Sequence, residues 1–119
     1  MPGLRVLIVD DQPGFRDAAR ELLRARGHIV VAEAQSGQTA LEAVERCAPD
    51  AVLLDVRLGS ENGFVVSRRL MDANPDLRVL LTSVDAPNVG PERVHECGAR
   101  AFVLKQRLTK VDLDQLWHC

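Results

Sequence analysis

The stretch that decides the fold is residues 4–11, Leu-Arg-Val-Leu-Ile-Val-Asp-Asp, an aliphatic run of strand length that ends in two carboxylates. The run is apolar at nearly every position, which is typical of a strand covered on both faces in a parallel sheet. Four further runs of this kind follow, at Ile29–Ala34, Ala51–Leu54, Val79–Leu81 and Ala101–Leu104. The sequence therefore predicts five short strands in a parallel sheet.

The segments between these runs carry helical patterns. In the first segment, apolar residues recur at the spacing of one helix face, at Phe15, Ala18, Ala19, Leu22 and Leu23. Further helices are predicted from Ser36 to before Pro49, from Gly63 to Asn74, from Pro91 to Cys97, and from a capping box formed by Thr109 and Asp112. Strands and helices that alternate in this way predict an α/β fold, a (βα)5 doubly wound open sheet.

Composition limits the function. The 119 residues carry a net charge of −2 and no basic block, so we expect no nucleic-acid binding by this chain alone. The aliphatic runs are too short to cross a bilayer, and we expect a cytoplasmic chain with no membrane contact. Three cysteines without a Cys-x-x-Cys spacing predict neither a disulfide framework nor a zinc site, and Cys47 and Cys97 are interpreted as small core residues.

The residues that directly follow the strands carry the chemistry. Parallel strands end at one edge of a sheet, and ligands bind beyond their carboxyl ends. That edge receives Asp10 and Asp11 after the first strand, Asp55 after the third, Thr82 and Ser83 after the fourth, and Lys105 after the fifth. Three carboxylates brought together require a cation, and oxygen ligands without His or Cys predict Mg²⁺.

These motifs resemble the receiver domain of bacterial two-component response regulators. The resemblance rests on Leu-Ile-Val-Asp10-Asp11, Leu-Leu-Asp55, the hydroxyl after the fourth strand and Val-Leu-Lys105, and on the spacing between them. It covers residues 1–119 as a single receiver domain and implies a flavodoxin-like sheet of strand order 2-1-3-4-5. The implied activity is a phosphorelay switch rather than a metabolic enzyme.

The resemblance also implies the phosphorylation and metal residues. Asp55 corresponds to the phosphoacceptor, which attacks a phosphoryl group carried on a histidine of a sensor kinase or phosphotransfer protein. Asp11, Asp55 and the backbone carbonyl of Arg57 would hold Mg²⁺, and Asp10 would act on the metal mostly through water.

Further residues would contact the phosphoryl group or respond to it. The resemblance gives Lys105 and a hydroxyl as contacts to the phosphoryl oxygens, and Phe102 as the aromatic residue of the switch. Counting from both flanking motifs selects Ser83 as the hydroxyl, with Thr82 as the alternative.

The loops depart from the family pattern in two places. Gly59 replaces a proline that is common four residues after the phosphoacceptor, and we expect a more mobile loop there. Arg57 and Asp85 flank the expected pocket, and we hypothesise an ion pair that partly covers it. Residues 87–91 are rich in helix breakers, so we expect the fourth helix to start late or to be poorly ordered.

Partners follow from the resemblance alone. The face formed by the fourth helix, fifth strand and fifth helix would bind a downstream protein or a fused output domain, or form a homodimer. Whether the chain acts alone or within a longer regulator stays open. The alternatives are a phosphorylation-independent pseudo-receiver, and an aspartyl phosphatase, which Arg57 disfavours because that chemistry needs a second acid at this position.

Overall fold

The computed structural model describes residues 3–85 and 89–118. Five parallel strands form the main sheet: β1 (Arg5–Val9), β2 (Ile29–Ala34), β3 (Ala51–Asp55), β6 (Arg78–Ser83) and β7 (Ala101–Leu104). Their order is β2-β1-β3-β6-β7, with every neighbouring pair parallel. This is the predicted 2-1-3-4-5 flavodoxin-like order, so the fold prediction is confirmed.

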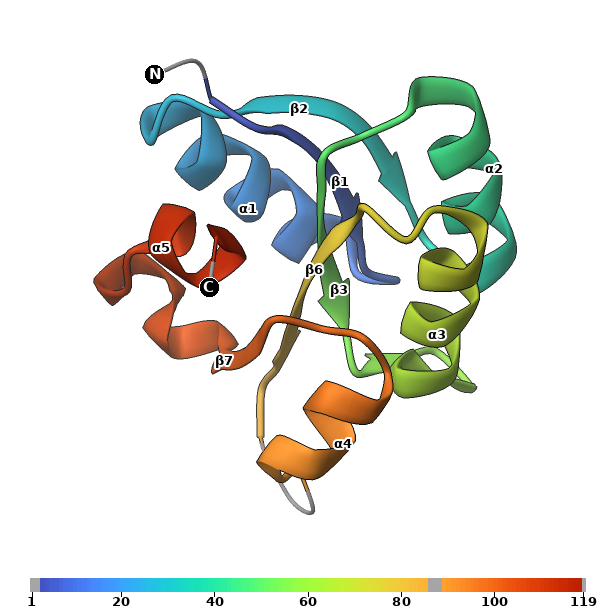
Figure 1. Cartoon of the computed structure of the whole chain (residues 1–119). Coiled ribbons are helices and arrows are strands. Elements are labelled where there is room, and N and C mark those ends of the chain that lie inside the picture. The colour runs from blue at the N-terminus through green and yellow to red at the C-terminus, as the bar shows by residue number, and fades with distance from the viewer. Residues whose placement is uncertain (1–2, 86–88, 119) are drawn as a thin grey trace.

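Helices cover both faces of this sheet (Figure 1). The helices are α1 (Pro13–Ala25), α2 (Gly37–Cys47), α3 (Gly63–Ala73), α4 (Pro91–Glu96) and α5 (Leu113–His118). Helices α1 and α5 pack on one face, and α2, α3 and α4 lie over the other. Among the described residues, no helix has the length and apolar character needed to span a bilayer.

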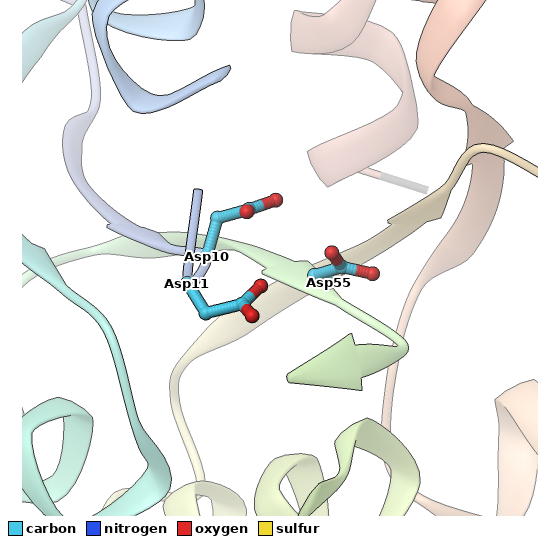
Figure 2. Close-up of side chains that lie close together, drawn as sticks. All are labelled: Asp10, Asp11 and Asp55. Atoms are coloured by element: carbon cyan, nitrogen blue, oxygen red, sulfur yellow. The ribbon is translucent and has the colours of Figure 1, made fainter. Parts of the chain in front are cut away.

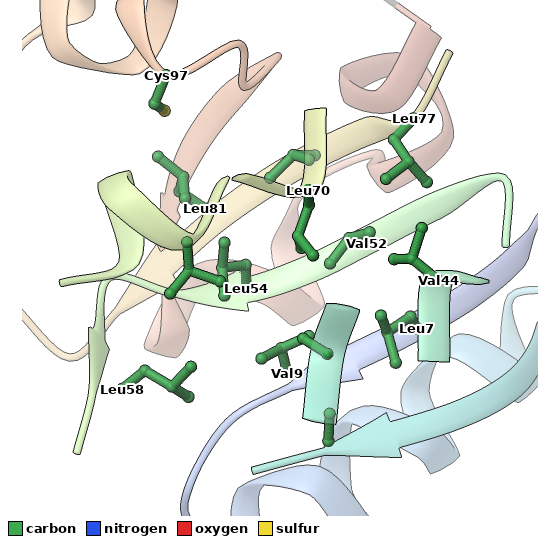
Figure 3. Close-up of a cluster of buried hydrophobic side chains, with 14 of the residues drawn as sticks. Leu7, Val9, Val44, Val52, Leu54, Leu58, Leu70, Leu77, Leu81 and Cys97 are labelled. Atoms are coloured by element: carbon green, nitrogen blue, oxygen red, sulfur yellow. The ribbon is translucent and has the colours of Figure 1, made fainter. Parts of the chain in front are cut away.

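Strand alternation divides the core into two layers. Successive side chains of a strand point to opposite faces, and in β1 this sends Leu7 and Val9 to the α2 and α3 side while Val6 and Ile8 face α1 and α5. Figure 3 shows the first of these layers. Cys97 is buried in it, as predicted, whereas Cys47 is only half-buried. Cys119 lies outside the described residues.

A short hairpin follows β3 where the sequence predicted only a mobile loop. Strands β4 (Arg57–Leu58) and β5 (Glu61–Asn62) pair antiparallel around a two-residue turn. Gly59 takes a φ of 63°, and type II′ turns place glycine at this first central position. Glycine here allows a tight turn, and the β4–β5 hairpin has its own backbone pairing.

The capping box predicted at Thr109 is wrong. Residues Lys105–Lys110 form a 3₁₀ helix, and α5 begins only at Leu113. The Arg26 guanidinium donates hydrogen bonds to the carbonyls of Thr109 (2.7 Å) and Val111 (2.6 Å), a contact across 83 and 85 residues of chain. The cap is supplied by Asp112, whose Oδ1 accepts from the Gln115 amide at 3.2 Å.

The fourth helix begins at Pro91, the predicted first residue, and does not start later as the breakers suggested; its six residues make it short. The Ser67 hydroxyl donates to the Cys97 carbonyl (2.9 Å) and Arg68 donates to the Glu96 carbonyl (3.1 Å). Side chains of α3 therefore satisfy carbonyls at the carboxyl end of α4. Residues 86–88, part of the breaker-rich loop, lie outside the described residues.

Candidate functional site

The carboxyl ends of three strands bring the predicted acidic residues and the lysine to one edge of the sheet. Asp10 and Asp11 follow β1, Asp55 is the last residue of β3, and Lys105 directly follows β7. Figure 2 shows the three carboxylates side by side at the ends of β1 and β3. The expectation drawn from strand ends is therefore met for the acidic residues and the lysine.

The acidic cluster could hold a metal ion. One carboxylate oxygen from each of Asp10, Asp11 and Asp55 lies within 4.8 Å of the other two. Asp10 and Asp55 are buried, whereas Asp11 is exposed. Three negative charges this close repel one another, and two of them have also lost water, so a cation at this place would lower the free energy of the folded chain.

The Lys105 ammonium supplies part of that positive charge. Its Nζ lies 2.7 Å from Asp10 Oδ2 and 3.1 Å from Asp55 Oδ2, and its side chain is 13% exposed. Apart from this ion pair, Asp10 Oδ2 accepts no hydrogen bond from the described residues. One ammonium thus serves two buried carboxylates, and hard oxygen donors remain for a divalent cation, which fits the chemistry of Mg²⁺.

The two charged partners have shifted pKa values. Burial raises the pKa of Asp55 and the nearby charge of Asp10 adds to this, while the Arg57 amide and the Lys105 ammonium oppose it. Burial alone would lower the pKa of Lys105, but its hydrogen bond to Asp10 and the charges of both carboxylates outweigh this and raise the pKa. Lys105 is therefore a cation near neutral pH, and it faces the Asp55 carboxylate, whose ionised form is disfavoured by burial.

The backbone fixes the orientation of the Asp55 side chain. Its Oδ1 accepts a hydrogen bond from the Arg57 amide at 2.9 Å, and its Oδ2 faces Lys105. The next residue, Val56, donates its amide to the Thr82 carbonyl of β6 at 2.9 Å. Asp55 is therefore held from three elements: the first residue of the 3₁₀ helix after β7, the β4–β5 hairpin and β6.

Both candidate hydroxyls lie at the end of β6. The register places Thr82 opposite Asp55, with Ser83 one residue further along the strand. Thr82 is fully buried, and its Oγ1 has no hydrogen-bond partner among the described residues. Ser83 ends the strand and is 2% exposed, and strand alternation places it on the same face as Leu81, two residues earlier. The assignment of Ser83 as the contact to a phosphoryl oxygen stays a prediction.

Phe102 is half-buried on β7, where it is paired in register with Leu81. Its ring packs against the core layer that contains Leu81 and Val94, and it lines a surface pocket of about 390 Å³ beside α4. Phe102 is thus an edge-packing residue at the face where the switch was expected.

The hypothesised ion pair is present in the structure. Arg57 Nη2 lies 3.4 Å from Asp85 Oδ1, and both side chains are more than half exposed. The pair joins the β4–β5 hairpin to the segment that follows β6, so it bridges two of the loops around Asp55.

Two contacts at this site had no signal in the sequence. The Phe15 ring centroid lies 4.1 Å from Lys105 Nζ, a cation–π contact. Arg16 donates to the backbone carbonyl of Asp10 at 2.6 Å. The helical spacing marked Phe15 only as an inward-facing residue, because periodicity shows which face is buried but not which charged group lies beneath it.

Comparisons with known proteins agree with this geometry. The family model of the response regulator receiver domain matches residues 6–116. Transcriptional regulatory protein DegU of Brevibacillus brevis is 31% identical over 104 residues, which are 87% of this chain and 44% of that protein. The chain spans about half the length of the curated relatives it matches.

Solved structures show the same fold. A LuxR-family two-component response regulator from Aurantimonas sp. SI85-9A1 matches with a TM-score of 0.85 and 28% identity, over 95% of this chain and 81% of that one. The signal receiver domain of the putative response regulator NarL from Mycobacterium tuberculosis matches with a TM-score of 0.77 and 32% identity, over 98% of both chains.

The matched family consists of signalling modules rather than enzymes, in agreement with the sequence prediction. Its model extends from β1 to α5 and therefore includes the acidic cluster and Lys105. On the evidence of the sheet order, the site and these relatives, the chain belongs to the response regulator receiver domain family.

Proposed function

We propose that the chain accepts a phosphoryl group on Asp55 from a phosphohistidine of a sensor histidine kinase or phosphotransfer protein, in a reaction that requires Mg²⁺. The observation that carries this proposal is the Lys105 ammonium between two buried carboxylates, 2.7 Å from Asp10 and 3.1 Å from Asp55. That arrangement holds a carboxylate nucleophile beside positive charge, which are the two things that phosphoryl transfer needs most.

In the proposed reaction, a carboxylate oxygen of Asp55 forms the new P–O bond while the P–N bond to the donor imidazole breaks. The electron pair of that bond passes to the imidazole nitrogen. The Arg57 amide orients the nucleophile by its hydrogen bond to Oδ1. Lys105 and Ser83 would stabilise the negative charge on the phosphoryl oxygens.

Mg²⁺ would be held by Asp11, Asp55 and the backbone carbonyl of Arg57, with Asp10 acting mostly through water. When bound, the ion supplies charge neutralisation for the phosphoryl oxygens. The fit of this group rests on the three clustered carboxylates and on Asp10 Oδ2, a buried oxygen whose partner is a single ammonium.

The proposed output is a change of the face formed by α4, β7 and α5. Phe102 would turn inward when Ser83 moves toward the phosphoryl group, so that the population shifts between two side-chain arrangements of this face. Its half-buried position beside the pocket at α4 supports this role. The face would then bind a downstream protein, an output domain or a second copy, in the cytoplasm where the phosphohistidine donor is formed.

The experiment is intact mass after incubation with acetyl phosphate and Mg²⁺. The proposal predicts one phosphoryl adduct in the natural chain and none in the Asp55→Asn variant or in the presence of chelator. An adduct that forms without Asp55 or without metal contradicts the proposal. Absence of any adduct, under conditions that label a known receiver, favours the pseudo-receiver alternative.

A further inference from the structure

The β4–β5 hairpin is attached to helix α2 by one carboxylate. Glu61 of β5 accepts a hydrogen bond from the backbone amide of Gly37 at 2.8 Å, through its Oε1. Gly37 is the first residue of α2, whose first turn contains no acidic residue. The negative charge that favours a helix N-terminus is therefore supplied from outside the helix.

Close packing makes this contact specific. A Cβ atom at position 37 would lie 2.6 Å from Glu61 Oε2 and 3.0 Å from Val66 Cγ2. Only glycine leaves room for the carboxylate in this place. Ser36 already caps the amide of Thr39, so Glu61 satisfies a different amide of the same helix end.

The other parts of the β4–β5 hairpin lie against the acidic cluster. The Arg57 amide binds Asp55 Oδ1 at 2.9 Å, and a Cβ at Gly59 would lie 3.8 Å from Asp11 Oδ2. The hairpin thus extends from Asp55 past Asp11 to α2. Glu61 is the described side chain that ties its second strand to that helix.

We propose that Glu61 is a positioning residue for the metal site. By holding β5 on the N-terminus of α2, it fixes the β4–β5 hairpin, and so the Arg57 peptide, beside Asp11 and Asp55. This inference rests on the proposed function, because it assigns to the Arg57 peptide a role in Mg²⁺ binding. It couples metal affinity to α2, a helix that contributes no ligand.

The test is a Mg²⁺ titration followed by the backbone amide signals of Arg57 and Gly59 in NMR spectra. Glu61→Ala is expected to weaken Mg²⁺ binding about tenfold, the lower end of what is typical for residues that orient metal ligands. Glu61→Gln keeps an acceptor oxygen and should restore most of the affinity. Glu45→Ala, at an exposed position on α2, is the matched control and should leave the affinity unchanged.

A second variant disturbs the contact between Glu61 and Gly37 at its α2 end. Gly37→Ala displaces the Glu61 carboxylate, and its Cβ also approaches Val66 Cγ2, so urea unfolding is recorded beside the titration to show that the variant keeps its fold. It should weaken Mg²⁺ binding as Glu61→Ala does, and the double variant should be no weaker than either single one. Amide hydrogen exchange at residue 37 should become faster in Glu61→Ala.

Faster exchange at residue 37 with unchanged Mg²⁺ affinity would overturn the inference, because Glu61 would then serve only the helix. Additive losses in the double variant would overturn it as well, and so would a natural chain that binds no Mg²⁺. A natural chain that binds Mg²⁺ but forms no phosphoryl adduct would contradict the proposed phosphoryl acceptance, while the titration would still decide the role of Glu61.

Discussion

At the scale of single residues, the end of β6 sets two hydroxyls in different environments. Thr82 is fully enclosed and its Oγ1 is unpaired among the described residues, whereas Ser83 occupies the last position of the strand. A buried hydroxyl without a partner costs free energy relative to an apolar group of the same shape. We therefore expect removal of the Thr82 hydroxyl to change stability, and removal of the Ser83 hydroxyl to change phosphorylation.

Thr82→Val should raise the free energy of unfolding by about 1 kcal/mol and leave Asp55 phosphorylation intact, because it removes only an unpaired group. Ser83→Ala should slow labelling by acetyl phosphate about fivefold, the effect of losing one hydrogen bond of about 1 kcal/mol in the transition state. Urea unfolding and timed mass spectra measure the two effects. The opposite pattern would assign the phosphoryl contact to Thr82.

At the scale of elements, the β4–β5 hairpin and the segment after β6 form two sides of the site. The Arg57–Asp85 ion pair joins them at 3.4 Å. Because both side chains are more than half exposed, the pair contributes only about 0–1 kcal/mol to stability. We therefore expect the pair to act on the access of water to Asp55 rather than on the fold.

Neutralising the pair with Arg57→Gln and Asp85→Asn together should speed loss of the phosphoryl group by up to about fivefold, the rate equivalent of 1 kcal/mol. The substitutions leave the Arg57 backbone in place. Dephosphorylation rates should also rise with salt in the natural chain, since salt screens exposed pairs. The Arg68–Asp72 pair on α3 is a matched control, and its neutralisation should not alter the rate. An unchanged lifetime in the Arg57 and Asp85 double variant would refute the hypothesis.

At the scale of the whole molecule, the buried acidic site lowers the free energy of unfolding at neutral pH. The sheet edge brings three carboxylates together, and burial raises the pKa of Asp55. A carboxyl whose pKa is higher in the folded than in the unfolded chain stabilises the fold while it is protonated. That stabilisation is complete below the ordinary pKa of aspartate and is lost as the pH rises through the raised pKa.

The Asp55→Asn variant should therefore be more stable than the natural chain at pH 7 in the absence of Mg²⁺. The difference should shrink as the pH falls and be smallest below about 3, where the natural carboxyl is protonated in both the folded and the unfolded chain. Added Mg²⁺ should stabilise the natural chain more than the variant. Urea unfolding at several pH values measures this, with Asp76→Asn as an exposed control. A variant that is less stable than the natural chain at pH 7 would contradict the effect of burial on Asp55.

The sequence predicted the main sheet and most of the site because those features have local signals. Continuous apolar runs marked the five strands, and Asp10, Asp11, Asp55 and Lys105 each stand directly after one of them. Gly59 was noticed as a departure, but the β4–β5 hairpin around it was missed because two-residue strands carry no periodicity. The Thr109 capping box is absent because Lys105–Lys110 form a 3₁₀ helix and α5 begins only at Leu113. Arg26, far away along the chain, donates to the carbonyls of Thr109 and Val111 in this segment, a contact that no local motif reports.

The sequence by itself determined the fold class, the strand positions and the residue types at the strand ends, because apolar patterns and strand termini are properties of short segments. Only the tertiary structure decided the contacts that hold the site in place, such as Phe15 over Lys105 and Glu61 on the amide of Gly37. These contacts depend on the register of parallel strands and on how loops close over the sheet edge. No local pattern carries that information, because the partners become neighbours only when the sheet is assembled.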